Sequence, residues 1–252
     1  MSLQKESKLF LIDFFVFLFV GAIFGSFIFS FINRQTLTLE AKAISITSPP
    51  SFCPSCKRTL KPLMLIPIIS YLFLMGKCWY CKSRIKVSYL IYELLIGLFT
   101  IFFFINLDIT WINILLYLIC ILIIIQILLD YKFLLLSTNI STLIIILGLA
   151  LALIGNEITI TDSFLGICLG YSSLWLLNFI FKSIKSKDGI GDGDFIFLAS
   201  LCSVLGYKLI GPIVLGGSII SLLIYITGFK EGTLLPFGTG MGLATLFLIL
   251  FL

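Results

Sequence analysis

The stretch INILLYLICILIIIQILLD, residues 112–130, carries no charged residue before its last position, Asp130. Such a run is long and apolar enough to cross the hydrocarbon core of a bilayer as an α-helix. Polar and apolar residues do not alternate along it, as they do in the strands of membrane β-barrels. The sequence contains eight charge-poor runs of this kind, at about 9–32, 89–107, 110–129, 133–155, 159–181, 191–209, 211–229 and 233–252. We therefore expect an all-α polytopic membrane protein with about eight transmembrane helices.

The composition agrees with this fold class and excludes several kinds of enzyme. Of the 252 residues, 60% are hydrophobic and 12% are charged, whereas soluble domains carry about 25% charged residues. The chain contains no histidine, which excludes a Ser-His-Asp or Cys-His nucleophile and an HExxH metalloprotease. If the protein hydrolyses a substrate, carboxylates are the expected acid and base. The first apolar run is too long for a signal-peptide core, so we expect a retained first span.

The basic residues predict the orientation of the chain. The polar insertion 33–88 holds nine of the seventeen Lys and Arg residues. With eight spans, the membrane face of this insertion carries fourteen basic residues, and the other face carries only Lys5, Lys8 and Lys208. The positive-inside rule places the insertion in the cytoplasm and both termini outside, in a bacterial inner (cytoplasmic) membrane. Topology thus explains the net charge of +5 without nucleic acid as a partner, and anionic lipid is a secondary partner by charge.

Four cysteines in the insertion predict a metal site. Cys53, Cys56, Cys78 and Cys81 follow the pattern C-x2-C, 21 residues, C-x2-C. Two such turns can bring four thiolates into the tetrahedron that zinc prefers, with no position left open for catalysis. The alternatives are two redox pairs or free thiols, while a cytoplasmic location argues against stable disulfides. We expect three parts: a first transmembrane helix (1–32), a zinc-binding insertion (33–88) and a seven-helix membrane domain (89–252).

Two aspartates are predicted to meet at one membrane face. Asp130 ends the third apolar run and Asp194 begins the sixth, so the fourth and fifth runs form one out-and-back excursion between them. Two carboxyl groups in a partly desolvated cleft share a proton, as in aspartic proteases. The ionised carboxyl activates water, and the protonated one stabilises the oxyanion. Asp194 could instead cap its helix, Asp130 could pair with Lys132, or the two acids could form the proton relay of a transporter.

Glycine and proline residues near these acids favour the catalytic interpretation. Gly189, Gly191 and Gly193 permit the close approach of an extended peptide beside Asp194. In LPFGTG, residues 235–240, Pro236 and Gly238 either border the cleft as a broken helix or simply begin the last helix. Glu93 likewise either lines the site or reaches the membrane interface.

The segment GDGD, residues 191–194, fits the GxGD signature, and the whole chain resembles the bacterial type IV prepilin peptidases, which are intramembrane aspartic proteases. Further segments similar to that family are GSF (25–27) with Arg34, IPIISYLFLMGKCWYC (66–81), SYLIYELLIGLF (88–99), GDGDFIFLASLCSVLG (191–206) and LPFGTGMGLA (235–244). The resemblance implies that Asp130 and Asp194 are the catalytic aspartates and that the four cysteines form a cytoplasmic zinc-type module. It also implies removal of the basic leader from prepilins and pseudopilins, followed in many members by N-methylation with S-adenosylmethionine.

The chain departs from the family pattern outside the two aspartates. The Leu-Pro that follows the first aspartate is Leu136-Ser137 here, and the other departures are Phe29, Leu65, Ser88-Tyr89-Leu90 and Ile196. No Gly-rich fingerprint marks a site for S-adenosylmethionine. The alternatives to a bifunctional enzyme are a peptidase without methyltransferase activity, a proton-coupled transporter with a structural zinc module, and a zinc-bearing assembly subunit. The sequence also leaves homo-oligomers open.

Overall fold

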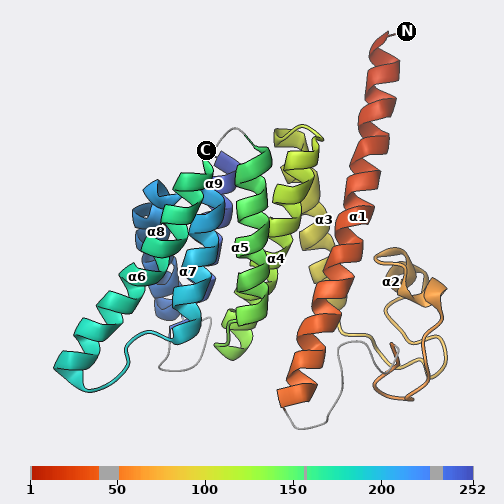
Figure 1. Ribbon diagram of the computed structural model, residues 1–252. Coiled ribbons are helices and arrows are strands. Elements are labelled where there is room, and N and C mark those ends of the chain that lie inside the picture. The colour runs from red at the N-terminus through yellow and green to blue at the C-terminus, as the bar shows by residue number, and fades with distance from the viewer. Residues whose placement is uncertain (1, 40–50, 156–157, 228–234, 252) are drawn as a thin grey trace. The chain divides into compact units, whose positions relative to one another are not determined.

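The computed structural model describes residues 2–39, 51–155, 158–227 and 235–251. Within these residues the secondary structure is helical, apart from two isolated β-bridges in the insertion. The elements in chain order are α1 (Ser2–Leu39), η1 (Pro62–Leu65), α2 (Ile69–Phe73), α3 (Ser88–Asn106), α4 (Trp111–Phe133), α5 (Thr138–Ile154), α6 (Ile160–Lys185), α7 (Asp192–Leu205), η2 (Tyr207–Leu209), α8 (Ile210–Ile226) and α9 (Phe237–Phe251) (Figure 1). The predicted all-α class is confirmed for the described residues.

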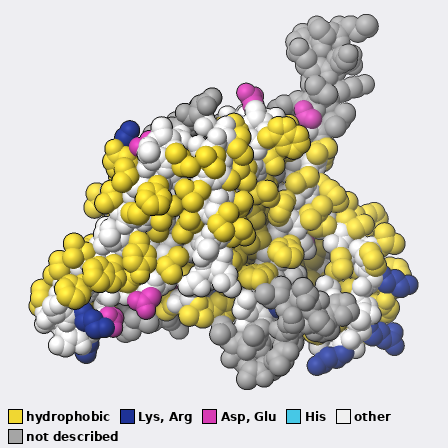
Figure 2. Space-filling model, viewed as in Figure 1, with side chains coloured by type: hydrophobic (Ala, Val, Ile, Leu, Met, Phe, Trp, Pro, Cys, Tyr) yellow, Lys and Arg dark blue, Asp and Glu magenta, His cyan; other side chains and the backbone are white. Residues whose placement is uncertain are grey.

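Each predicted apolar run contains a helix, but eight membrane spans are not confirmed. Five described segments are long and apolar enough to cross a membrane: Asp13–Gln35, Ser88–Asn106, Trp111–Phe133, Ile160–Lys185 and Tyr207–Ile226. The helices α5, α7 and α9 have only 17, 14 and 15 residues. Large hydrophobic side chains remain exposed along the helices, as Figure 2 shows for one face. The chain is therefore a multi-pass membrane protein.

The chain forms two compact units, Met1–Asp108 and Ile109–Leu252. In the first unit, α1 packs along α3, and glycines permit the close approach of the two helices. A Cβ on Gly25 would lie 2.7 Å from the carbonyl oxygen of Tyr92, so no side chain fits there. Small residues allow such backbone contacts between membrane helices. Since α3 packs with α1, the grouping of residues 89–252 as one domain stays a prediction.

In the second unit, α7 lies at the centre and packs against α5, α6 and α9. Nine of its fourteen residues are buried. Gly166 on α6 and Gly148 on α5 leave room for it, because a Cβ on either would overlap Cys202 or Ser203. As Figure 1 shows, α4 ends and α7 and α9 begin at the same end of this unit. The helix order therefore brings three chain segments together there.

Candidate active site

Asp130 lies in the last turn of α4, and its side chain is only 5% exposed. The backbone N–H of Thr239, in the first turn of α9, donates to Asp130 Oδ2 at 2.6 Å, and the Thr239 hydroxyl donates to the same oxygen at 2.8 Å. The first N–H groups of a helix have no partner within that helix. Pro236, immediately before α9, has no side-chain acceptor to supply. Asp130 therefore caps α9 from another helix, and this cap orients its carboxylate.

The start of α9 is packed directly against Asp130. A Cβ on Gly238 would lie 3.2 Å from Asp130 Cγ and 2.9 Å from Leu136 Cδ1. The Ser221 hydroxyl on α8 donates to the carbonyl of Pro236 at 3.1 Å. Pro236 and Gly238 thus stand at the start of α9, and Gly238 lies against Asp130. Their role in bordering a cleft stays a prediction.

Gln126 anchors the turn that follows Asp130. This fully buried residue lies one helical turn before Asp130. Its Nε2 donates to the carbonyl of Ser137 and to the Ser141 hydroxyl, both at 2.8 Å, and its Oε1 accepts the Ser137 N–H at 3.0 Å. A proline at position 137 could not donate that last bond. The serine that replaces the family proline is therefore used by this chain to hold the α4–α5 turn.

Asp194 lies in the first turn of α7 and is half-buried. Gly191 occupies the N-cap position without a side-chain hydrogen bond, and the Asp194 N–H donates to the Gly191 carbonyl at 3.0 Å. Asp194 is therefore not the N-cap of its helix, which was one alternative. Leu136 in the α4–α5 turn lies against the position of Gly193, next to Asp194, and against that of Gly238, which borders Asp130. The two predicted aspartates thus lie at the same end of the second unit (Figure 1).

Leu136 packs between the start of α7, which carries Asp194, and the start of α9, which holds Asp130. A Cβ on Gly193 would lie 3.1 Å from Leu136 Cβ, and Leu136 also contacts the position of Gly238. The α4–α5 turn therefore spaces the start of α7 from the start of α9. Asp192, between the two motif glycines, is exposed.

Asn178 on α6 holds the loop that leads into α7. This buried side chain accepts the N–H groups of Gly189 and Ile190 at 2.8 and 3.1 Å, and donates to Asp188 Oδ1 at 3.3 Å. Lys182 forms an ion pair with Asp188 at 3.0 Å, so Lys182, not the neighbouring Lys187, is its partner. The Lys182 hydrogen bond and, to a smaller extent, that of Asn178 lower the pKa of Asp188.

The four cysteines of the insertion lie in two matching turns of the first unit. The Cys53 N–H donates to the Arg58 carbonyl at 3.0 Å, and the Cys78 N–H donates to the Ser83 carbonyl at 2.8 Å. The residue after each second cysteine, Lys57 or Lys82, has a φ near +60°. The two C-x2-C segments therefore adopt the same local fold and face each other.

The sulfur atoms of this cluster fit a single metal ion. The Sγ atoms of Cys53, Cys56, Cys78 and Cys81 all lie within 4.8 Å of one another, and Cys53 Sγ is 3.8 Å from Cys81 Sγ. Tetrahedral zinc with bonds of about 2.3 Å requires sulfur atoms about 3.8 Å apart. Burial opposes ionisation of Cys53, yet hydrogen bonds from the backbone of Cys56 and Ser55 lower its pKa to about 6. The close spacing of the four sulfur atoms, rather than the pKa of one thiol, therefore supports a metal site.

Glu93 belongs to the first unit, with the insertion. Its side chain is 6% exposed, and its Oε2 accepts the N–H of Ile68 at 2.7 Å. Ser26 on α1 also hydrogen-bonds to it. Glu93 therefore joins α3 to α1 and to the insertion, and its reach to a membrane interface stays a prediction. Its role in lining a site stays a prediction.

Sequence reasoning missed four residues of this geometry: Gln126, Leu136, Asn178 and Thr239. Gln126 and Asn178 could have been singled out from the sequence, because an amide inside an apolar run needs buried hydrogen-bond partners. Nothing in the sequence singles out Thr239, because threonine is common in apolar helices and its partner Asp130 lies 109 residues away.

Comparisons with known proteins agree with this organisation. Residues 19–107 match the bacterial peptidase A24 N-terminal domain, and residues 114–226 match the type IV leader peptidase family. These ranges correspond closely to the two compact units. No solved structure matches the chain significantly.

Several curated relatives are described as prepilin leader peptidase/N-methyltransferase. The protein of Dichelobacter nodosus is 34% identical over 82% of this chain and 72% of its own length. The protein of Pectobacterium carotovorum is 29% identical over 89% of this chain and 88% of its own length. For the 32% identical protein of Neisseria gonorrhoeae the match spans 73% of this chain but only 64% of the relative. The chain therefore belongs to the type IV leader peptidase family of enzymes.

Proposed function

We propose that the protein is an aspartic endopeptidase that removes the basic leader from type IV prepilins and pseudopilins. The observation that carries the proposal is that Asp130, at the end of α4, and Asp194, at the start of α7, lie at the same end of the second unit (Figure 1). Leu136 in the α4–α5 turn contacts the start of α7 and the start of α9, whose Thr239 holds Asp130. Like charges held together share one proton, which is the starting state of aspartic protease catalysis.

The pair can perform both halves of the reaction. Its ionised carboxylate takes a proton from a water molecule as the water oxygen attacks the scissile carbonyl. Its protonated carboxyl donates to the carbonyl oxygen, so that a neutral tetrahedral intermediate forms. When the C–N bond breaks, the carboxyl that took the water proton gives it to the leaving amine, and the other carboxylate takes a hydroxyl proton from the intermediate, so that the pair again holds one proton. Thr239 orients Asp130 throughout, because its two hydrogen bonds hold Oδ2.

The glycines of the GxGD motif support a peptide substrate. Gly191 is exposed, and a Cβ there would lie only 3.4 Å from Asp194 Oδ2. A side chain at this position would lie in van der Waals contact with the acid, whereas glycine leaves that space to an extended backbone. Leu136 already occupies the space beside Gly193.

We further propose that the enzyme methylates the new N-terminus, with S-adenosylmethionine as the methyl donor, and that zinc is held by the four cysteines. The names of the relatives support methylation, and the sulfur geometry supports zinc. When bound, zinc would supply folding energy to the insertion. The charge distribution supports a bacterial inner-membrane location with the insertion and the dyad on the cytoplasmic side.

A single assay tests the proposal. The purified protein is incubated with a prepilin precursor and S-adenosylmethionine, and the N-terminal mass of the product is measured. We expect loss of the leader and the added mass of one methyl group. Cleavage without methylation would restrict the enzyme to peptidase activity. An uncleaved precursor, with ion transport by the reconstituted protein, would favour the transporter instead.

A further inference from the structure

The insertion presents large apolar side chains to solvent. The most exposed are Phe73 and Met75, at 83% and 84%, and Leu63, Leu72 and Trp79 are also exposed. These residues lie in a module bounded by α1 and α3, outside the spans themselves. Exposed apolar patches of this kind mark a surface that another apolar phase covers.

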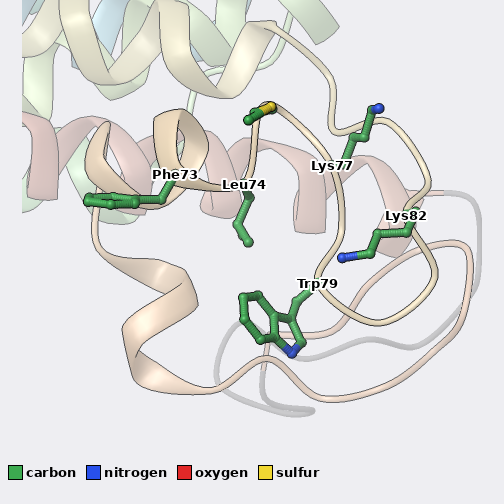
Figure 3. A pocket seen from close by; sticks show the side chains of 6 residues that line it. Phe73, Leu74, Lys77, Trp79 and Lys82 are labelled. Atoms are coloured by element: carbon green, nitrogen blue, oxygen red, sulfur yellow. The ribbon is translucent and has the colours of Figure 1, made fainter.

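A pocket in this surface combines apolar and cationic side chains. It has a volume of about 310 Å³ and is lined by Phe73, Leu74, Met75, Lys77, Trp79 and Lys82. The ammonium group of Lys82 lies 5.5 Å from the centre of the Trp79 ring. Figure 3 shows the Lys82 side chain reaching toward Trp79 across the pocket, opposite Phe73. The pocket can thus bind an anion beside an apolar group.

The metal-binding turn holds this arrangement in place. Trp79 lies between Cys78 and Cys81, and the Lys82 N–H donates to the Cys78 carbonyl at 3.0 Å. Phe73 ends α2, and Gly76 follows at a φ of +66° with its N–H bonded to the Tyr71 carbonyl. The two turns bring the end of α2 against the second cysteine pair.

The net charge of the insertion indicates which class of partner its exposed surface can bind. No acidic residue occurs between Glu40 and Glu93, whereas residues 51–88 contain seven cations: Lys57, Arg58, Lys61, Lys77, Lys82, Arg84 and Lys86. A zinc ion with four thiolates carries a charge of about −2 and leaves an excess of positive charge. This surface repels a basic leader peptide and attracts anionic head groups.

We propose that this aromatic–lysine patch (Phe73, Met75, Lys77, Trp79 and Lys82) binds anionic phospholipid of the bilayer that the chain itself crosses. The two segments that flank the insertion, Asp13–Gln35 and Ser88–Asn106, are candidate membrane spans, so both ends of the insertion emerge at one membrane face. Aromatic and apolar side chains enter the interface, while lysines meet the lipid phosphates. The proposal does not depend on the peptidase activity.

Trp79 provides the probe for this proposal. The chain has three tryptophans, so Trp111→Phe with Trp175→Phe leaves Trp79 as the only one. The full-length protein is reconstituted with zinc into bilayers of phosphatidylcholine, with or without phosphatidylglycerol, carrying brominated acyl chains. We expect quenching and a blue shift of Trp79 emission in the anionic bilayers, with both effects reduced in neutral bilayers or high salt.

Two charge variants separate the patch from the general charge of the module. Lys77→Gln with Lys82→Gln should abolish the dependence of quenching on anionic lipid. Lys57→Gln with Lys61→Gln removes the same charge outside the pocket and should leave that dependence intact. Zinc content and cleavage of a precursor, measured on both variants, show that they remain folded.

Three results would overturn the proposal. One is quenching of Trp79 emission by acrylamide, but not by brominated lipid, in anionic bilayers. Another is equal quenching by brominated lipid in neutral and anionic bilayers. The third is protection of Trp79 by a prepilin leader peptide in neutral bilayers, which would assign the patch to substrate instead.

Discussion

Thr239 donates two hydrogen bonds, from its N–H and from its hydroxyl, to one oxygen of Asp130, Oδ2, although the two residues lie 109 positions apart in the chain. The first turn of α9 therefore orients an acid at the end of α4. This relationship makes Thr239 a positioning residue for the proposed dyad.

The hydroxyl of Thr239 can be removed while the backbone bond remains. Thr239→Val should lower kcat/KM for precursor cleavage roughly 10- to 100-fold, because a hydrogen bond to a charged group contributes about 1.5–3 kcal/mol. The loss should appear in kcat and in the pH profile, with KM little changed. Thr239→Ser keeps the hydroxyl and should retain most activity. Equal rates for the valine variant and the parent would remove Thr239 from the mechanism.

The two aspartates should be indispensable and their neighbour should not. We expect Asp130→Asn and Asp194→Asn each to reduce leader cleavage on the order of 10⁴-fold, since removal of one member of a catalytic unit has effects of this size. Asp192→Asn, two residues from Asp194 and exposed, is the matched control and should cleave normally. Zinc content and detergent-solubilised yield should match the parent in all three. Substantial cleavage by either dyad variant would refute the assignment.

Gln126 should contribute to stability rather than chemistry. Gln126→Leu leaves the N–H and carbonyl of Ser137 without their side-chain partners, at a cost of about 1–3 kcal/mol. Denaturant titration in detergent should show this loss. Ser137→Ala, which keeps both backbone groups, should unfold at nearly the parental midpoint. If both variants unfold alike, the amide does not hold the turn.

The loop before α7 should loosen in acid. The hydrogen bonds from Lys182 and Asn178 lower the pKa of Asp188, so the folded loop favours its ionised form. That stabilisation is present above the ordinary carboxyl pKa of about 3.9 and is lost as the pH falls through the lowered value. Hydrogen exchange of the Gly189 and Ile190 amides, corrected for intrinsic rates, should accelerate over this window. Asp188→Asn should abolish the pH dependence, and a parent loop insensitive to pH would contradict the ion pair.

Removal of the metal should unfold the insertion selectively. We expect about one zinc per chain by elemental analysis, as four closely spaced thiolates bind one ion. Cys78→Ser or strong chelators should release zinc and expose residues 51–87 to protease. Cys168→Ser, at an isolated cysteine on α6, should keep the metal. A protein that retains its full zinc content after Cys78→Ser would rule out the site.

Several features followed from sequence alone because they depend on local pattern or on chain direction. The charge-poor runs predicted the positions of eight helices within the described residues, five of which are long enough to be candidate spans. The spacing of the cysteines predicted a metal-type cluster, since a C-x2-C turn is a local structure. The common end of the second unit at which Asp130 and Asp194 lie (Figure 1) followed from counting the two helices between them.

Tertiary structure decided which helices can face lipid and what holds the acids. The run at 191–209 is apolar and was expected to be a span, but α7 ends at Leu205. Its neighbours α5, α6 and α9 bury most of it, which hydropathy alone does not predict. Thr239 on α9, Asn178 on α6 and Leu136 in the α4–α5 turn contact segments that lie far from them in the sequence. Sequence by itself thus determined the helical membrane fold, the metal-type cluster and the common end of the second unit at which the two acids lie. Packing decided that Asp130 caps α9 and that Asn178 holds the loop before α7. Short polar side chains in apolar helices acquire such partners only when the helices meet.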